Sequence, residues 1–201
     1  MTPAFVQFLD DTVEVPGLGK VNIDIAYGGC FYCLIDGRQF GLDIVPENAR
    51  KLVDIGMRTQ QVLNRSREIV HPEIAAIRGI SYTMMLGWNG DGEPTGATIL
   101  PPGRVDRSPC GTGNAARLAC RFARGEVEIG DKVTARSIIG SSFDVEFTGT
   151  TTVANLPATL ARVSGRGFIH GLHQIGHDPA DPFPQGFLLT DTWGEALDLL
   201  N

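Results

Sequence analysis

Apolar and polar residues alternate over several short stretches of the chain, which is the pattern of half-buried strands. The stretches that indicate strands cover residues 3–9, 21–25, 31–35, 75–86, 97–100, 132–138, 143–147, 150–154, 158–163 and 168–169. Turn sequences rich in glycine, proline or serine separate most of them. The pattern therefore predicts a mostly antiparallel sheet.

Two stretches have the longer spacing of a helix. Pro46 opens the first, which runs to about Glu68 with apolar residues recurring close to every 3.6 positions. The second follows Cys110 and has apolar residues around most of its circumference, so we expect it to be buried, and Gly125 marks its end. Together the elements predict an α/β fold in which the sheet wraps around one buried helix.

Composition and charge narrow the class of protein. The chain has 201 residues, 25 glycines, 12 prolines and a net charge of −6, which argues against binding to nucleic acid or to an anionic membrane. The sequence shows neither a signal peptide nor an apolar run of membrane-spanning length. Four cysteines are too few for a disulfide scaffold. We therefore expect a soluble cytoplasmic protein with reduced thiols.

The segment Asp106-Arg-Ser-Pro-Cys-Gly-Thr-Gly113 carries the clearest chemical signal. It places Cys110 at the start of the predicted buried helix, where free N–H groups and the positive end of the helix dipole favour a thiolate. Gly111 and Gly113 leave those N–H groups open to a carboxylate, and Asp106 could hold an ammonium group. These groups suit an amino-acid site, although a turn before a buried helix is the simpler interpretation of a lone Pro-Cys-Gly.

This segment resembles the second active-site motif of the proline racemase family, which includes proline racemases, 4-hydroxyproline epimerases and trans-3-hydroxyproline dehydratases. Other stretches resemble family segments in the same order: residues 2–6, 24–32, 71–73, 165–166, 173–174 and 178–184. The resemblance implies an isomerase that moves a proton at the substrate Cα between two cysteines, without cofactor or metal. It implies that Cys110 is one of these cysteines, that Asp106 meets the ring nitrogen, and that Gly111 and Thr112 bind the carboxylate.

The resemblance also implies a diaminopimelate-epimerase-like fold of two lobes, each with a sheet around a central helix. Residues 19–164 would form a complete lobe carrying Cys110. Residues 1–18 would be a remnant of the other lobe, and residues 165–201 a segment that returns to it. We expect the face left open to be apolar, so that the chain associates through it, for instance as a homodimer.

The sequence departs from the family at the first catalytic cysteine. The family's Met-Cys-Gly-His-like motif is missing, and residues 1–27 contain no cysteine or histidine. We therefore expect a C-terminal portion of a family member, weak or inactive as an isolated chain. Cys30, Cys33 and Cys120 are interpreted as small core residues.

Substrate choice stays open between proline and hydroxyproline. Ser81 and Tyr82 stand where the epimerases carry Asp-His, which argues against 4-hydroxyproline as the substrate. Tyr82 is a candidate substrate contact. Cys110 argues against the dehydratases, which usually have threonine there. His170, His173 and His177 are spaced too irregularly to predict a metal site. The alternative to an isomerase is a non-catalytic remnant, or a lobe that binds a proline-type amino acid.

Overall fold

The computed structural model describes residues 2–186, and the chain up to Arg166 forms one compact unit. Its helices are the α-helices α1 (Ala49–Ser66) and α2 (Gly111–Ala123) and the short 3-10 helices η1 (Gly37–Phe40) and η2 (Pro46–Asn48). Its strands are β1 (Ala4–Val15), β2 (Gly19–Tyr27), β3 (Phe31–Asp36), β4 (Tyr82–Trp88), β5 (Pro94–Leu100), β6 (Arg104–Val105), β7 (Lys132–Ser137), β8 (Ser142–Val153) and β9 (Leu156–Gly165).

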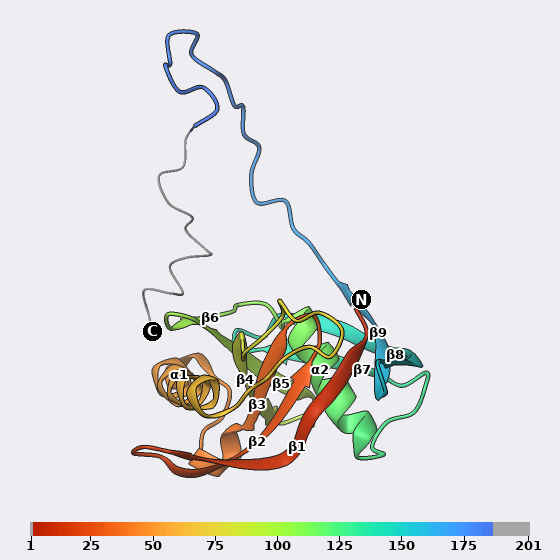
Figure 1. The fold of residues 1–201 in the computed structure, drawn as a ribbon. Coiled ribbons are helices and arrows are strands. Elements are labelled where there is room, and N and C mark those ends of the chain that lie inside the picture. Colours follow the sequence, from red (N-terminus) through yellow and green to blue (C-terminus); the bar gives the residue numbers. More distant parts are fainter. Residues whose placement is uncertain (1, 187–201) are drawn as a thin grey trace. The chain divides into compact units, whose positions relative to one another are not determined.

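The strands belong to a single sheet in the order β4-β3-β2-β1-β9-β8-β7-β5-β6. An additional pairing between β4 and β5 closes this sheet into a ring, with β6 attached to β5 (Figure 1). The β3–β4 and β5–β7 pairs are parallel, and the other strand pairs are antiparallel. The prediction of a mostly antiparallel sheet is confirmed.

Helix α2 lies inside this ring (Figure 1) and contacts β1, β2, β3, β8 and β9. Its buried side chains are mainly small, with Ala115 and Ala116 fully buried and Ala119 nearly so. Small side chains let strands approach a helix from several directions, which explains why this sequence fits inside a ring of strands. The predicted buried helix is thus confirmed, together with a sheet wrapped around it.

Helix α1 packs on the outside of the ring, against β1, β4 and β5 (Figure 1). Leu52, Ile55 and Leu63 form its buried face. Gly56 allows close contact, because a Cβ at this position would lie 2.9 Å from the Ile99 side chain on β5. Strand residues with side chains on the outer face, among them Phe31 and Ile35, complete this larger hydrophobic core.

The structure corrects four predicted strands. Residues 75–81 form no strand; the Ile80 backbone instead bonds to the side chains of Gln60 and Asn64 on α1, so helix amides replace strand neighbours. The two strands predicted over residues 143–154 are one, β8, with an irregularity between Phe147 and Gly149. Residues 168–169 are not a strand.

Residues 167–186 belong to a second unit and contain turns but neither helix nor strand. The end of the predicted returning segment, residues 187–201, lies outside the described residues. The division of residues 1–18, 19–164 and 165–201 between two lobes stays a prediction. Among the described residues, no helix is both long and apolar enough to cross a membrane.

Candidate active site

Cys110 occupies the N-cap of α2, the helix inside the ring of strands. Its backbone has φ +65°, a conformation that is costly for a residue other than glycine and that is frequently found at functional sites. The residue is 6% exposed, and its Sγ accepts a hydrogen bond from the Gly113 N–H at 3.4 Å. The first turn of α2 therefore directs at the sulfur an N–H group that has no intrahelical acceptor, and a thiolate at this position stays a prediction.

Two glycines provide the space for this arrangement. A Cβ on Gly113 would lie 2.9 Å from both Cys110 Sγ and Met84 Sδ. A Cβ on Gly28, in the turn between β2 and β3, would lie 2.1 Å from the Thr112 carbonyl oxygen. The first turn of α2 thus packs directly against the backbone of that turn, which fixes where Cys110 lies.

Asp106 supports the Cys110 backbone through Ser108. The Asp106 carboxylate accepts hydrogen bonds from the Ser108 N–H at 2.9 Å and from its hydroxyl at 2.8 Å. Ser108 Oγ in turn accepts the Cys110 N–H at 3.1 Å. The Asp106 N–H bonds to the Thr98 carbonyl on β5 at 2.8 Å, which anchors the loop to the ring. Asp106 therefore orders the loop before α2, and its contact with a substrate amine stays a prediction.

Tyr32 is a site residue that the sequence analysis missed. Its hydroxyl lies 3.3 Å from Cys110 Sγ and 2.7 Å from Thr112 Oγ1. Burial, followed by the proximity of Cys110, strongly raises the pKa of Tyr32. Strand alternation contained the signal, because Tyr32 has the parity of Leu34, which packs in the same cluster as Cys110, while Phe31 and Cys33 face the outer core.

The remaining predicted residues lie around this hydroxyl. Gly111 and Thr112 are half-buried in the first turn of α2. Tyr82 begins β4, and its ring centroid is 5.7 Å from that of Tyr32. The structure thus brings Cys110, Thr112 and Tyr82 together around Tyr32, with Gly111 in the same helical turn.

The other three thiols differ from one another. Cys33 and Cys120 are buried, and burial raises the pKa of each, in agreement with their interpretation as core residues. Cys30 is only half-buried and packs against the cluster that contains Cys110. Burial raises the pKa of Cys30 most, the Tyr32 and Ser81 hydroxyls oppose this, and Cys110 adds to it. Cys30 is therefore a neighbour of the candidate site rather than a simple core residue.

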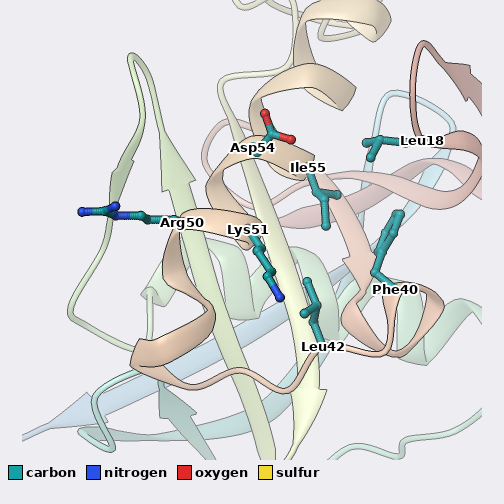
Figure 2. A pocket seen from close by; sticks show the side chains of 7 residues that line it. All are labelled: Leu18, Phe40, Leu42, Arg50, Lys51, Asp54 and Ile55. Carbon is teal, nitrogen blue, oxygen red and sulfur yellow. The ribbon is translucent and has the colours of Figure 1, made fainter.

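A recess of about 410 Å³ on the outside of the ring has different chemistry. Figure 2 shows it beside α1, with an apolar lining and the charged side chains Arg50, Lys51 and Asp54. None of the residues around Cys110 lines this recess.

Residues 2–186 also contain no cluster of three histidine, cysteine or acidic side chains suited to a metal ion.

Comparison with known proteins gives a consistent result. Residues 1–188 match the model of a family described as "Proline racemase". A curated 4-hydroxyproline 2-epimerase from Agrobacterium fabrum is 51% identical over 96% of this chain and 56% of its own length. The chain thus spans little more than half the length of this relative.

Two crystal structures are similar in fold as well as in sequence. A hydroxyproline epimerase from Agrobacterium vitis, with bound trans-4-hydroxy-L-proline, has a TM-score of 0.84 and 48% identity over all of this chain and 58% of that one. A probable proline racemase from Agrobacterium radiobacter, with bound carbonate, has a TM-score of 0.83 and 47% identity over 96% of this chain and 57% of that one.

Proposed function

The chain belongs to the proline racemase family, and from this premise we propose that it carries one half of the machinery of a proline-type racemase or epimerase. In this proposal Cys110 is the group that exchanges a proton with the substrate Cα. The observation that carries it is the position of Cys110 Sγ, at the N-terminus of the buried helix α2 and within 3.3 Å of the Tyr32 hydroxyl.

The first turn of α2 supports the assignment of a carboxylate site. The N–H groups of Gly111 and Thr112 are in the turn that has no intrahelical acceptors, and both residues are half-buried rather than enclosed. A substrate carboxylate there would meet the positive end of the helix dipole. Asp106 lies in the preceding loop, and its carboxylate accepts hydrogen bonds from Ser108. In this proposal the same carboxylate also accepts a hydrogen bond from the ring ammonium of the substrate.

The proposed reaction needs no redox step. The Cys110 thiolate takes the α-proton, and the electron pair of the broken C–H bond stays on Cα and spreads into the carboxylate. The N–H groups at the helix N-terminus stabilise the negative charge that develops there. A second acid then returns a proton to the opposite face of Cα, a role that the family resemblance assigns to another cysteine.

Hydroxyproline is the substrate best supported. The Agrobacterium relative is named a 4-hydroxyproline 2-epimerase, and the A. vitis epimerase has trans-4-hydroxy-L-proline bound. Proline is the alternative substrate, since Ser81 and Tyr82 replace the Asp-His pair expected of an epimerase. A lobe that binds such an amino acid without turning it over is the second candidate function, favoured by the half-buried first turn of α2, whose N–H groups suit a carboxylate.

Loss of the Cα proton to solvent tests this proposal. The chain is incubated in heavy water with trans-4-hydroxy-L-proline or L-proline. The Hα resonance of the amino acid is followed by proton NMR, and Cys110→Ala is the control. Exchange that disappears in Cys110→Ala supports the assignment. Binding by calorimetry without exchange supports the binding lobe. A chain that neither exchanges nor binds any cyclic amino acid rules out both functions.

A further inference from the structure

Tyr32 connects two parts of the candidate site that the proposed function treats separately. Its hydroxyl is 3.3 Å from Cys110 Sγ, the proposed base, and 2.7 Å from Thr112 Oγ1, in the proposed carboxylate site. The residue is 1% exposed, and its ring packs among Met84, Ala116 and other apolar side chains. Hydrogen bonds in such an environment are strong, because little water competes for them.

The possible donors fix the direction of this chain of hydrogen bonds. A thiolate can only accept, so Tyr32 donates its single proton to Sγ when Cys110 is ionised. The Tyr32 oxygen then accepts from the Thr112 hydroxyl, which has a proton to give. Because burial and Cys110 raise the pKa of Tyr32, the tyrosine keeps its proton throughout the pH range in which a thiol ionises.

We propose that Tyr32 is a positioning residue that holds the Cys110 thiolate and makes its basicity depend on occupancy of the carboxylate site. This inference rests on the proposed function. A carboxylate on the first turn of α2 attracts the Thr112 hydroxyl proton, and the Tyr32 oxygen then loses its donor. Tyr32 consequently donates a weaker hydrogen bond to Sγ. The thiolate becomes a stronger base once a substrate is in place.

Three other titratable groups surround Cys110, and their contacts distinguish them from Tyr32. Cys30 precedes β3, Tyr82 begins β4, and Asp106 lies in the loop before α2. The Asp106 carboxylate bonds to Ser108, Tyr82 contacts the Tyr32 ring, and the Cys30 thiol interacts with the Tyr32 and Ser81 hydroxyls. Within residues 2–186, the Tyr32 hydroxyl is the side-chain group within hydrogen-bond distance of Cys110 Sγ.

The test follows alkylation of Cys110 by iodoacetamide against pH in the intact chain, with modified peptides resolved by mass spectrometry. Tyr32→Phe removes the donor to Sγ, so the pH midpoint rises by about one unit, equivalent to about 1.4 kcal/mol. Thr112→Val removes the hydroxyl that donates to the Tyr32 oxygen, so the pH midpoint rises by less than in Tyr32→Phe. Tyr27→Phe, a change on the neighbouring strand β2 whose ring stacks on Phe5 away from Cys110, leaves it unchanged.

Two outcomes overturn the inference. One is a Tyr32→Phe midpoint equal to that of the unaltered chain, with an unchanged circular dichroism spectrum. The other is a Thr112→Val midpoint equal to that of the unaltered chain, and this second variant decides the matter if Tyr32→Phe does not fold. Neither readout needs turnover, so absence of Cα exchange would refute the proposed isomerase without altering this result.

Discussion

Gly28 and Thr112 touch through their backbones: a Cβ on Gly28 would lie 2.1 Å from the Thr112 carbonyl oxygen and 2.7 Å from the Ala116 nitrogen. This contact joins the β2–β3 turn to the first turn of α2. Because both partners are backbone, neither can move aside as a flexible side chain would. The position of the candidate active site therefore depends on the absence of a side chain at residue 28.

Gly28→Ala should accordingly destabilise the fold. Forcing a methyl group into this contact is expected to lower the free energy of unfolding by about 3 kcal/mol, at the upper end of the range for overpacking. Urea denaturation measures the loss. Gly90→Ala is the control, since a Cβ there meets no atom within 4 Å. Equal midpoints for the two variants would contradict the close contact.

Cys110 should be the most reactive thiol of the native chain near neutral pH. It receives an N–H hydrogen bond at the N-terminus of α2, whereas burial raises the pKa of Cys30, Cys33 and Cys120. Limited treatment with iodoacetamide and peptide mass spectrometry gives the order of modification. Labelling of Cys30, Cys33 or Cys120 as fast as or faster than that of Cys110 in the folded chain would refute the thiolate site. Labelling in denaturant, where all four thiols are exposed, is the control.

Asp24→Asn should weaken the contact between β2 and the end of α2. The buried Asp24 carboxylate accepts hydrogen bonds from the Asp10 N–H at 2.9 Å and from both terminal nitrogens of Arg124, at 2.9 Å and 2.8 Å. Removing its charge weakens both hydrogen bonds to Arg124 and leaves the exposed Asp10 carboxylate as the charged partner of that guanidinium, and we expect a loss of about 2 kcal/mol.

Asp54→Asn provides the matched control for this ion pair. Asp54 bonds to Arg58 at 2.9 Å on the exposed surface of α1, where a single pair contributes about 0.5 kcal/mol or less. Both variants are compared by urea denaturation. If Asp24→Asn is no more destabilised than Asp54→Asn, the Asp24–Arg124 pair does not contribute to the free energy of unfolding as its geometry indicates.

Asn64→Ala should disturb the segment before β4. The Asn64 amide accepts the Ile80 N–H at 2.7 Å and donates to the Ile80 carbonyl at 3.1 Å, and Ile80 is buried. Leaving that N–H without a partner costs about 1 to 3 kcal/mol. Hydrogen exchange at Ile80 should accelerate with the loss of stability. Ser66→Ala, which removes an exposed bond to Val62, should change neither quantity.

Local patterns were sufficient to predict most elements, because alternation and helical spacing depend on neighbours in sequence. They also indicated Cys110, because the segment 106–113 is sufficient to predict that a helix begins there. Strand alternation placed Tyr32 on the inner face of β3 but could not show what it meets there, since 78 residues separate it from Cys110 and the closure of the ring brings them together. Ile80 lies in a stretch with the composition of a strand, but the side-chain amides of Gln60 and Asn64 bond to its backbone instead.

The enclosure of α2 constrains the order of events in folding. The helix lies in the chain between β6 and β7, while the seam of the ring with the largest separation in sequence joins Ala4 and Phe5 of β1 to Thr159 and Ala158 of β9. Contacts this distant in sequence carry a large loop-closure cost and form slowly. A helix cannot enter a finished ring, so α2 must be surrounded as the seam forms. We therefore expect the packing of α2 against β1 and β9 to be among the last contacts that form during folding.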